Sequence, residues 1–585
     1  MQSFLQYRRF GAAARAQIDR GKAKANQANS TQSEPTSAVA NEEVQQHIPR
    51  QSEANSHHGV NTTVDPESGR TVEEDGESIA GLPIHEVTTT QTRHSMRTAL
   101  GHSLTGILAR NRHAHEGQGG KVFVVDWEGP HDRLNPHNWS IPRRVGVTLQ
   151  ISLIGFFLTA ASGIDATVLP QAAADLHVSQ VAESLATGLY LVGMGLGSLI
   201  AGPFSETFGR NAVYTGSMAI FMIWIMASAL APNFGAQITF RFLAGCSAST
   251  PLVCAGGSIA DMYDSIEKTW AFPVFAIGSF GGPMLGAVMG AYIGPSPLVS
   301  WRWTEWTILI ASGLVLILVL LFMPETYGPL LLQWKAAHYR QLTGDDRFLC
   351  EHEIVDATLL TRLKVSITRP FRMLTEPIIM VMTLYITIVY IVLFTFLVGW
   401  PYIFEQTFSL DQGLANVIFV SMFVGTQANF LLVPIVYRIT LKHLQGGKFS
   451  PETRLWYGML GPSVLIPVSL FWLGWTAYSS ISVWSAIFAV AFFGFAVAGI
   501  FICIYMYIID SYEIYAASAL TFVALIRYVV AGGMTVVGIP FYENMGTHYT
   551  LTILACLAVL LAPAPYLLFR YGHHVRAKSR FAVDR

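Results

Sequence analysis

Beyond residue 142 the chain is a succession of apolar segments of about 20 residues each, and this pattern constrains the fold more than any other feature. A helix of that length crosses a hydrocarbon core of about 30 Å, and lipid requires every backbone polar group to be paired within the protein. We therefore predict an all-α membrane protein. Twelve transmembrane helices are expected, near residues 145–168, 184–204, 211–231, 237–260, 270–294, 303–323, 376–400, 412–437, 455–477, 481–505, 515–538 and 548–570.

The longest interruption splits these segments into six plus six, an outline typical of transporters built from repeats. We expect two six-helix bundles and no nucleotide-driven motor, since no phosphate-binding loop occurs in the sequence. The predicted organisation is a disordered cytosolic tail over 1–142, an N-terminal bundle over 143–323, a cytosolic central loop over 324–375, a C-terminal bundle over 376–572 and a short cytosolic tail over 573–585. Disorder is predicted most strongly for 26–75, which is polar and lacks aromatic residues.

Composition excludes several classes of function. Hydrophobic residues make up 52% of the chain and charged residues 13%, against about 25% charged in soluble domains. A net charge of −1 gives no electrostatic case for nucleic-acid binding. Five scattered cysteines form neither a disulfide framework nor a zinc-ligand spacing. We predict no cofactor, no metal and no catalytic constellation, and hence a protein that is not an enzyme. We also predict that it is a monomer in the lipid bilayer.

Basic residues beside the segments indicate the orientation. With the N-terminus in the cytosol, the outer loops carry a single basic residue, Arg302, and all other loop lysines and arginines lie inside. Both termini are therefore predicted to be cytosolic. No apolar region typical of a signal peptide occurs near the N-terminus. The plasma membrane is the expected location, with the vacuolar membrane as the alternative.

Three charged residues stand out within the predicted helices, namely Asp165, Arg241 and Arg527. Each costs about 2.5–3.5 kcal/mol at a helix centre, and such residues usually have a function. An acid in a cavity can load and release a proton, and a nearby arginine tunes its affinity for that proton. The alternatives are an interfacial, hydrated Asp165 and an Arg241 side chain that extends outward to water.

The turn after the second segment contains Gly202, Glu206, Gly209 and Arg210. The glycines permit a tight turn between two helices. Glu206 is placed to pair with Arg210 or to lie at a neighbouring helix N-terminus, where an anion is favoured. Two interpretations remain open for this turn: a gate latch that opens and closes, or a plain turn with solvated charges.

The fifth segment carries glycines at every fourth position, at Gly278, Gly282, Gly286 and Gly290, with Pro283 among them. Steps of four lie nearly on one helix face, and small residues there let another backbone approach closely. Proline removes one hydrogen bond and favours a bend. We predict a close helix contact, and interpret it as a rocking interface between the two bundles or as static packing.

Aromatic residues are concentrated in the seventh and tenth segments. Such rings line sites for flat or cationic organic molecules, and the alternative is lipid-facing bulk. The candidate cavity residues are Tyr385, Tyr390, Trp400 and Tyr505.

Taken together, these motifs resemble the major facilitator superfamily, in particular its fungal twelve-span drug:proton antiporters. The resemblance covers 122–581. It rests on the turn 202–210, on the R-x-x-x-G pattern that begins at Arg241, on the glycines 278–290, and on Trp127-Glu-Gly-Pro and Pro324-Glu-Thr-Tyr. Ala287 and Ala291 depart from the antiporter pattern of the fifth helix.

The resemblance implies an efflux pump that exchanges protons for drugs, polyamines or secondary metabolites by alternating access, with the arginine at 241 taking part in proton coupling. Two alternatives share the same fold. One is a proton-linked importer of a nutrient or organic acid, and the other is a transporter-like sensor that signals through its long tail.

Overall fold

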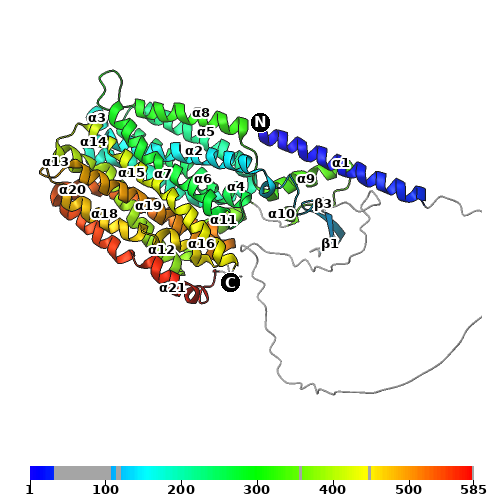
Figure 1. Cartoon of the computed structure of the whole chain (residues 1–585). Helices are drawn as coiled ribbons and strands as arrows, with labels where there is room; N and C mark the ends of the chain where they lie inside the picture. The colour runs from blue at the N-terminus through cyan, green and yellow to red at the C-terminus, as the bar shows by residue number, and fades with distance from the viewer. Residues whose placement is uncertain (32–106, 113–119, 355–358, 446–449, 583–585) are drawn as a thin grey trace, which may run out of the picture.

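The protein is described from a computed structural model that covers residues 1–31, 107–112, 120–354, 359–445 and 450–582. Within these ranges it is almost wholly helical. The long helices lie alongside one another in one block, and helix α1 with a small sheet projects from one end of it (Figure 1). We call this end the linker side, because the residues between the two halves of the chain lie there.

The first half of the block is formed by six long helices and three short ones. Their bounds are η2 (Pro136–Asn138), α2 (Ile141–Ile164), η3 (Asp165–Thr167), α3 (Leu169–Asp175), α4 (Gln180–Phe208), α5 (Arg210–Ala229), α6 (Phe234–Met262), α7 (Lys268–Ile293) and α8 (Trp303–Phe322).

The second half contains more interruptions. Its elements are α12 (Pro377–Trp400), η5 (Pro401–Glu405), α13 (Gln406–Phe408), α14 (Gln412–Val417), α15 (Phe419–Ala428), η6 (Asn429–Leu431), α16 (Leu432–Gln445), η7 (Pro451–Leu455), α17 (Trp456–Met459), α18 (Pro462–Thr476), α19 (Val483–Tyr512), η8 (Glu513–Tyr515), α20 (Ala516–Leu561) and α21 (Ala564–Arg576).

The structure has eleven, not twelve, continuous helical stretches long and apolar enough to cross a membrane within the described residues. The difference lies in the last stretch, Ala516–Arg576, which is 61 residues long. One residue within it, Gly546, has non-helical dihedrals with φ 73° and ψ 167°. The two predicted segments on either side of this glycine are therefore joined without an intervening loop.

The prediction of a disordered tail over 1–142 is wrong for its described parts. Residues Gln2–Thr31 form α1, and β1 (Ile107–Arg112) pairs antiparallel with β2 (Gly120–Val125). Helix α1 buries Phe10, Ala14 and Ile18, whose spacing of four places them on one face. That short apolar stripe was missed because the surrounding sequence is basic and polar. Most of 26–75 lies outside the described residues.

The central loop is also structured. It contains α9 (Gly328–Thr343), β3 (Phe348–Leu349), α10 (Glu351–Ile354), α11 (Leu359–Arg372) and η4 (Met373–Thr375). Strand β3 pairs in parallel with β2, so the expected all-α architecture holds for the membrane part alone. A small core of its own joins the sheet to α1 and α9, formed by Ala14, Ile18, Phe123, Val125, Ala336, Tyr339 and Phe348.

Contacts between the two halves follow two helix pairs. Helix α4 packs along α20, and α7 packs along α15. At the first of these, a Cβ built on Gly188 would lie 2.7 Å from the carbonyl oxygen of Gly532, so the backbones nearly touch. These two pairs enclose the space between the halves.

Candidate functional site

A cavity of about 570 Å³ lies between the two halves, within the range of sites that hold small organic ligands. Helices α2, α4, α6 and α7 line it from one half, and α12, α19 and α20 line it from the other. Pro283 and Tyr390 lie near the middle of α7 and α12, whereas Arg210, Lys268 and Asp510 lie at helix ends on the linker side. The cavity therefore extends from the middle of the block toward the linker side.

Arg241 is the centre of a buried charge cluster one helical turn beyond Ser162. Its side chain is 0% exposed. Nη2 lies 3.0 Å from Oδ2 of Asp165, and Nη1 lies 3.2 Å from Oε1 of Glu305. Nη2 also donates a 2.8 Å hydrogen bond to the carbonyl oxygen of Ala161, and the guanidinium lies over the ring of Tyr190. Arg241 therefore points inward, and the alternative of an outward-extending side chain is wrong.

The cluster contains more acid than base. Asp165 and Glu305 are 3% and 1% exposed, and both contact the same single cation. The Asp165 carboxylate lies within ion-pair distance of Arg241, yet the geometry of the pair does not meet hydrogen-bond criteria. Two buried carboxylates cannot both remain ionised beside one guanidinium without a large desolvation cost. The arrangement is suited to holding a proton.

A third acid extends this excess. Glu183, at the start of α4, is 1% exposed and accepts a 2.7 Å hydrogen bond from Nε2 of Gln237. Gln237 lies one turn before Arg241 on α6. The other oxygen of Glu183 is buried without a hydrogen-bond partner. Amide donation stabilises this carboxyl without supplying a positive charge.

Sequence reasoning missed both glutamates. Glu305 is the third residue of the predicted segment 303–323, so a complete count of charges within segments finds it. Glu183 precedes the predicted segment 184–204 by one residue, and α4 begins earlier than expected, at Gln180. An error of a few residues in a boundary hid this buried acid.

Arg527 lies on the cavity surface in a different environment. Its guanidinium carbon is 4.6 Å from the ring centre of Tyr390, 5.1 Å from that of Tyr505 and 4.5 Å from that of Tyr528. Nη1 donates to the hydroxyl of Tyr505. The ring of Phe501 lies 5.4 Å away. We call these four rings the aromatic cage.

The four predicted cavity aromatics divide into two pairs. Tyr390 and Tyr505 line the cavity, as predicted. Tyr385 and Trp400 are fully buried and do not line it. Trp400 stacks on Phe419 at 3.8 Å and donates from Nε1 to the carbonyl oxygen of Ala415. The prediction is wrong for Tyr385 and Trp400, which are packing residues inside the second half.

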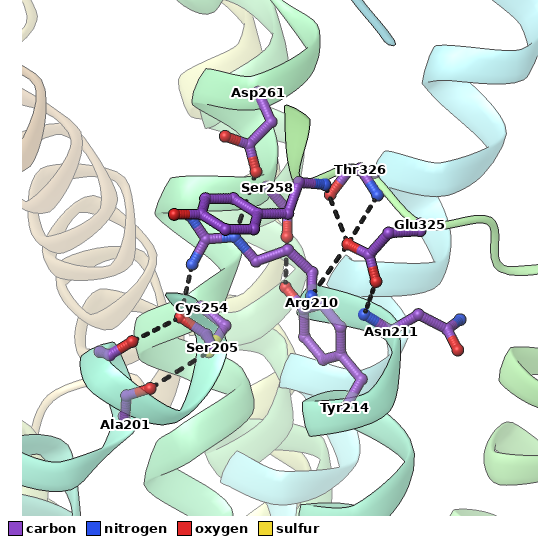
Figure 2. Close-up of polar contacts among 12 residues, drawn as sticks. Ala201, Ser205, Arg210, Asn211, Tyr214, Cys254, Ser258, Asp261, Glu325 and Thr326 are labelled. Carbon is purple, nitrogen blue, oxygen red and sulfur yellow. Dashed lines mark hydrogen bonds and ion pairs between the residues drawn. The ribbon is translucent and has the colours of Figure 1, made fainter. Parts of the chain in front are cut away.

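The turn between α4 and α5 forms a polar network on the linker side (Figure 2). Gly209 has φ 87°, a conformation that favours glycine. Arg210 pairs with Asp261 at 3.1 Å and donates to Ser205 at 2.6 Å. Glu206 is exposed, and no ion pair joins it to a described residue. The predicted Glu206–Arg210 pair is thus absent from this structure.

The carboxylate at the N-terminus of α5 belongs to Glu325 (Figure 2). It accepts from the backbone N–H groups of Arg210 at 2.9 Å and Asn211 at 3.0 Å. Burial raises the pKa of Glu325 above its ordinary value, while these backbone donors oppose the rise. The backbone of Glu325 also exchanges two hydrogen bonds with the Gln6 side chain. Helix α1 therefore contacts the same residue that caps α5.

The glycine stripe of α7 makes the predicted close contact, but with a different partner. A Cβ on Gly286 would lie 2.6 Å from the carbonyl oxygen of Ala160, and one on Gly282 or Gly290 would also clash with the α2 backbone. Gly278 faces Ser152 of the same helix α2. Because α2 belongs to the same half as α7, the interpretation of this stripe as the interface between bundles is wrong.

Pro283 adds to the α2 contact. A Cβ on Gly163 of α2 would clash with the carbonyl oxygen of Pro283, and Pro283 also lines the cavity. Helix α7 nevertheless remains one helix from Lys268 to Ile293. The stripe thus positions the end of α2, where Asp165 lies, against a helix that lines the cavity.

Comparisons with known proteins concern the family and the fold of this chain. Residues 151–536 match the family model described as Major Facilitator Superfamily. The chain is 48% identical over 466 residues to the MFS-type transporter kojT of Aspergillus flavus, which covers 78% of this chain and 82% of that one. It is 32% identical over 468 residues to the citrinin biosynthesis cluster MFS transporter mrr1 of Monascus ruber, with 79% and 93% covered.

Among solved structures, the proton:xylose symporter XylE bound to 6-bromo-6-deoxy-D-glucose matches with a TM-score of 0.53. The identity is 15%, and the match covers 74% of this chain and 96% of that one. At this identity the likeness concerns the fold alone. The named family and relatives are transporters rather than enzymes.

Proposed function

Because this chain belongs to the Major Facilitator Superfamily of membrane transporters, we propose that it exports small organic compounds from the cytosol in exchange for protons, by alternating access. The observation that carries this proposal is the buried cluster of Asp165, Arg241 and Glu305, in which acids outnumber the base beside a central cavity. Drugs, polyamines and secondary metabolites are the candidate cargo. The name of the mrr1 relative, from a biosynthesis cluster, favours secondary metabolites.

Proton coupling follows from the competition for Arg241. When a proton neutralises Asp165 or Glu305, the guanidinium keeps one ionised partner, and the excess charge of the cluster falls. When the proton leaves, the carboxylates repel each other and compete for the same cation. These residues lie on η3, α6 and α8, so the proton alters the forces among three helices of one half.

The transport cycle requires the two halves to move relative to each other. The cavity extends toward the linker side, and Arg210 with Asp261 lies at that end. On the opposite side, Gln412 of the second half donates to the carbonyl oxygen of Thr167 at 2.5 Å. We assign the gate role to Gly202, Glu206, Gly209 and Arg210, with Asp261 as the partner that holds Arg210 in this state.

The membrane arrangement is part of the proposal. Gly546 divides the last helical stretch into an eleventh and a twelfth span, which gives two six-helix bundles. The excess of basic residues on the linker side supports cytosolic termini. The plasma membrane is the proposed location, with the protein acting as a monomer.

The available driving force is sufficient without ATP. One proton crossing 100 mV supplies about 2.3 kcal/mol. One pH unit adds about 1.4 kcal/mol. At about 1.4 kcal/mol per tenfold, the sum supports a gradient of a few hundredfold for a neutral compound.

Everted plasma-membrane vesicles from yeast test the proposal, since uptake into them corresponds to export from a cell. Spermidine, ethidium and 2-naphthoate serve as probes for the polyamine, drug and aromatic-acid classes. The wild-type protein should accumulate at least one of them, and a protonophore should abolish the accumulation. Asp165→Asn should lose accumulation while retaining exchange of the probe across the membrane at equilibrium.

Asp175→Asn is the matched control. Asp175 pairs with the partly exposed Arg302, and the Trp301 and Arg302 donors lower its pKa, so it stays ionised. This variant should accumulate the probe like wild type. Undiminished, protonophore-sensitive accumulation by Asp165→Asn would refute its role in coupling. Accumulation only in right-side-out vesicles would replace the exporter with a proton-linked importer.

A further inference from the structure

The side chain of Arg527 has an unusual environment for a buried arginine. It lies in α20, is 4% exposed and borders the cavity. Its Nε atom is buried without a hydrogen-bond partner, and its hydrogen bond to Tyr505 goes to a neutral hydroxyl. No ion pair joins Arg527 to any residue that the structure describes.

Other buried arginines near the cavity differ in this respect. Arg210 pairs with Asp261, and Arg454 lies 2.6 Å from Oδ2 of Asp510. Arg241 has two carboxylates. Among the residues that the structure describes, Arg527 therefore differs from them in having no acidic partner.

An arginine stays protonated in proteins, so this site cannot discharge itself by losing a proton. The faces of Tyr390, Tyr505, Tyr528 and Phe501 attract the guanidinium, but rings carry no net charge. A cation in a low-dielectric cavity without a counterion has an unfavourable solvation energy. Binding of an organic anion would lower that energy, and binding of an organic cation would raise it.

The surroundings also favour a flat molecule. Phe272 and Phe280 line the cavity beside the cage, and within the cage Phe501 stacks on Tyr505 with ring centres 4.2 Å apart. Planar rings pack well against such faces. A planar anion thus satisfies both the unpaired guanidinium and the aromatic surface.

We propose that the cavity binds planar organic anions, such as aromatic carboxylates or enolates, with the anionic oxygens at Arg527 and the ring against Phe280 and Phe501. This substrate class rests on the proposed function and replaces the flat or cationic compounds expected from the aromatic residues alone. A guanidinium can donate two parallel hydrogen bonds to the two oxygens of a carboxylate, which fixes the orientation of the bound molecule. Tyr505 acts as a positioning residue, because its hydroxyl receives one Arg527 donor.

Binding to the purified full-length protein tests this class without requiring transport. Three probes share one ring system and differ in charge: 2-naphthoate, 2-naphthylmethanol and 2-naphthylmethylammonium. Their affinities are measured by quenching of intrinsic fluorescence and by thermal stabilisation in lipid nanodiscs. We expect 2-naphthoate to bind most tightly and the ammonium probe most weakly.

Arg527→Gln should lower the affinity for 2-naphthoate by about tenfold or more, because a hydrogen-bonded charge is lost. The affinity for 2-naphthylmethanol should be nearly unchanged. Arg527→Lys should restore part of the affinity for the anion. Tyr505→Phe keeps the ring and removes the hydroxyl. It should therefore lower the affinity for 2-naphthoate a few-fold and leave the affinity for 2-naphthylmethanol unchanged. Arg302→Gln, on a partly exposed residue outside the cavity, is the matched control and should change none of the affinities.

The variants also separate binding from folding. Unchanged affinity of Arg527→Gln for 2-naphthylmethanol shows that the cavity of this variant is intact. If Arg527→Gln is unstable, Tyr505→Phe allows the same comparison between the anionic and the neutral probe. Tighter binding of the ammonium probe by wild type, an equal loss of all three probes, or no binding of the anion would overturn the substrate class. Proton-driven transport of spermidine or ethidium in vesicles would then still support the exporter.

Discussion

Two buried arginines, Arg241 and Arg527, show how differently the two halves of this transporter use the same side chain. Arg241 lies beyond the cavity and contacts two carboxylates, with a third acid on the neighbouring helix. Arg527 borders the cavity and is surrounded by aromatic rings and a hydroxyl. The first site has an excess of acid and is suited to protons. The second has no acidic partner among the described residues, which fits the proposed anionic substrate.

Arg210 on the linker side is the intermediate case, because it pairs one to one with Asp261. A balanced pair needs neither a proton nor a ligand to be neutral. It is therefore suited to holding a conformation. The roles proposed for these arginines in proton binding, substrate binding and gating thus correspond to different numbers of neighbouring carboxylates, and variants at each site test that comparison.

Removing the cation from the acidic site should have the largest effect. Arg241→Gln leaves Asp165 and Glu305 buried without a positive charge, and breaking such a group costs about 3–5 kcal/mol. We expect a clear fall in the melting temperature of the detergent-solubilised protein and no detectable transport. Arg302→Gln should keep a melting temperature close to wild type. Equal melting temperatures of the two variants would show that Arg241 does not stabilise the buried carboxylates of Asp165 and Glu305.

A steric change should test whether the acidic site depends on the position of α2. In Gly286→Leu the new side chain meets the carbonyl oxygen of Ala160, and overpacking of this kind costs about 1–3 kcal/mol. Proton-driven flux should fall at equal amounts of protein in the membrane. Gly216→Leu is the control, because a Cβ there meets nothing within 4 Å. Similar flux in both variants would show that proton coupling does not depend on the glycine stripe of α7.

The balanced pair should give the smallest effect. Asp261→Asn leaves Arg210 without its carboxylate and should slow transport by about tenfold. Glu206→Gln should change the rate by less than about twofold, since an exposed charge without an ion pair contributes little. Initial rates of probe accumulation at matched expression measure both. A larger effect at Glu206 would favour the gate latch, one of the two interpretations that the sequence left open for this turn.

Local sequence patterns predicted the features that depend on the lipid environment. Apolar segments of about 20 residues identified the membrane helices, because lipid demands that length. The cost of a charge in lipid likewise singled out Asp165, Arg241 and Arg527. The glycines at every fourth position correctly predicted a close helix contact.

Errors arose where the outcome depended on a neighbour. The stripe on α7 faces α2 rather than the other half, and Trp400 packs on Phe419 rather than in the cavity. The tail was predicted to be disordered, yet α1 packs on α9 and binds the backbone of Glu325 through Gln6. Each of these outcomes requires a surface supplied by a distant part of the chain.

The sequence by itself therefore determined which segments are apolar helices and identified three of the charges that they bury, but not Glu183 or Glu305. Only the tertiary structure decided that Arg241 contacts both Asp165 and Glu305 and that Arg210 pairs with Asp261. It also decided that Arg527 lies among tyrosine rings, with no ion pair to a described acid. Hydropathy is a property of each segment alone and can be read locally. Charge pairing depends on how helices far apart in the chain are rotated toward one another, and packing of the whole bundle sets that rotation.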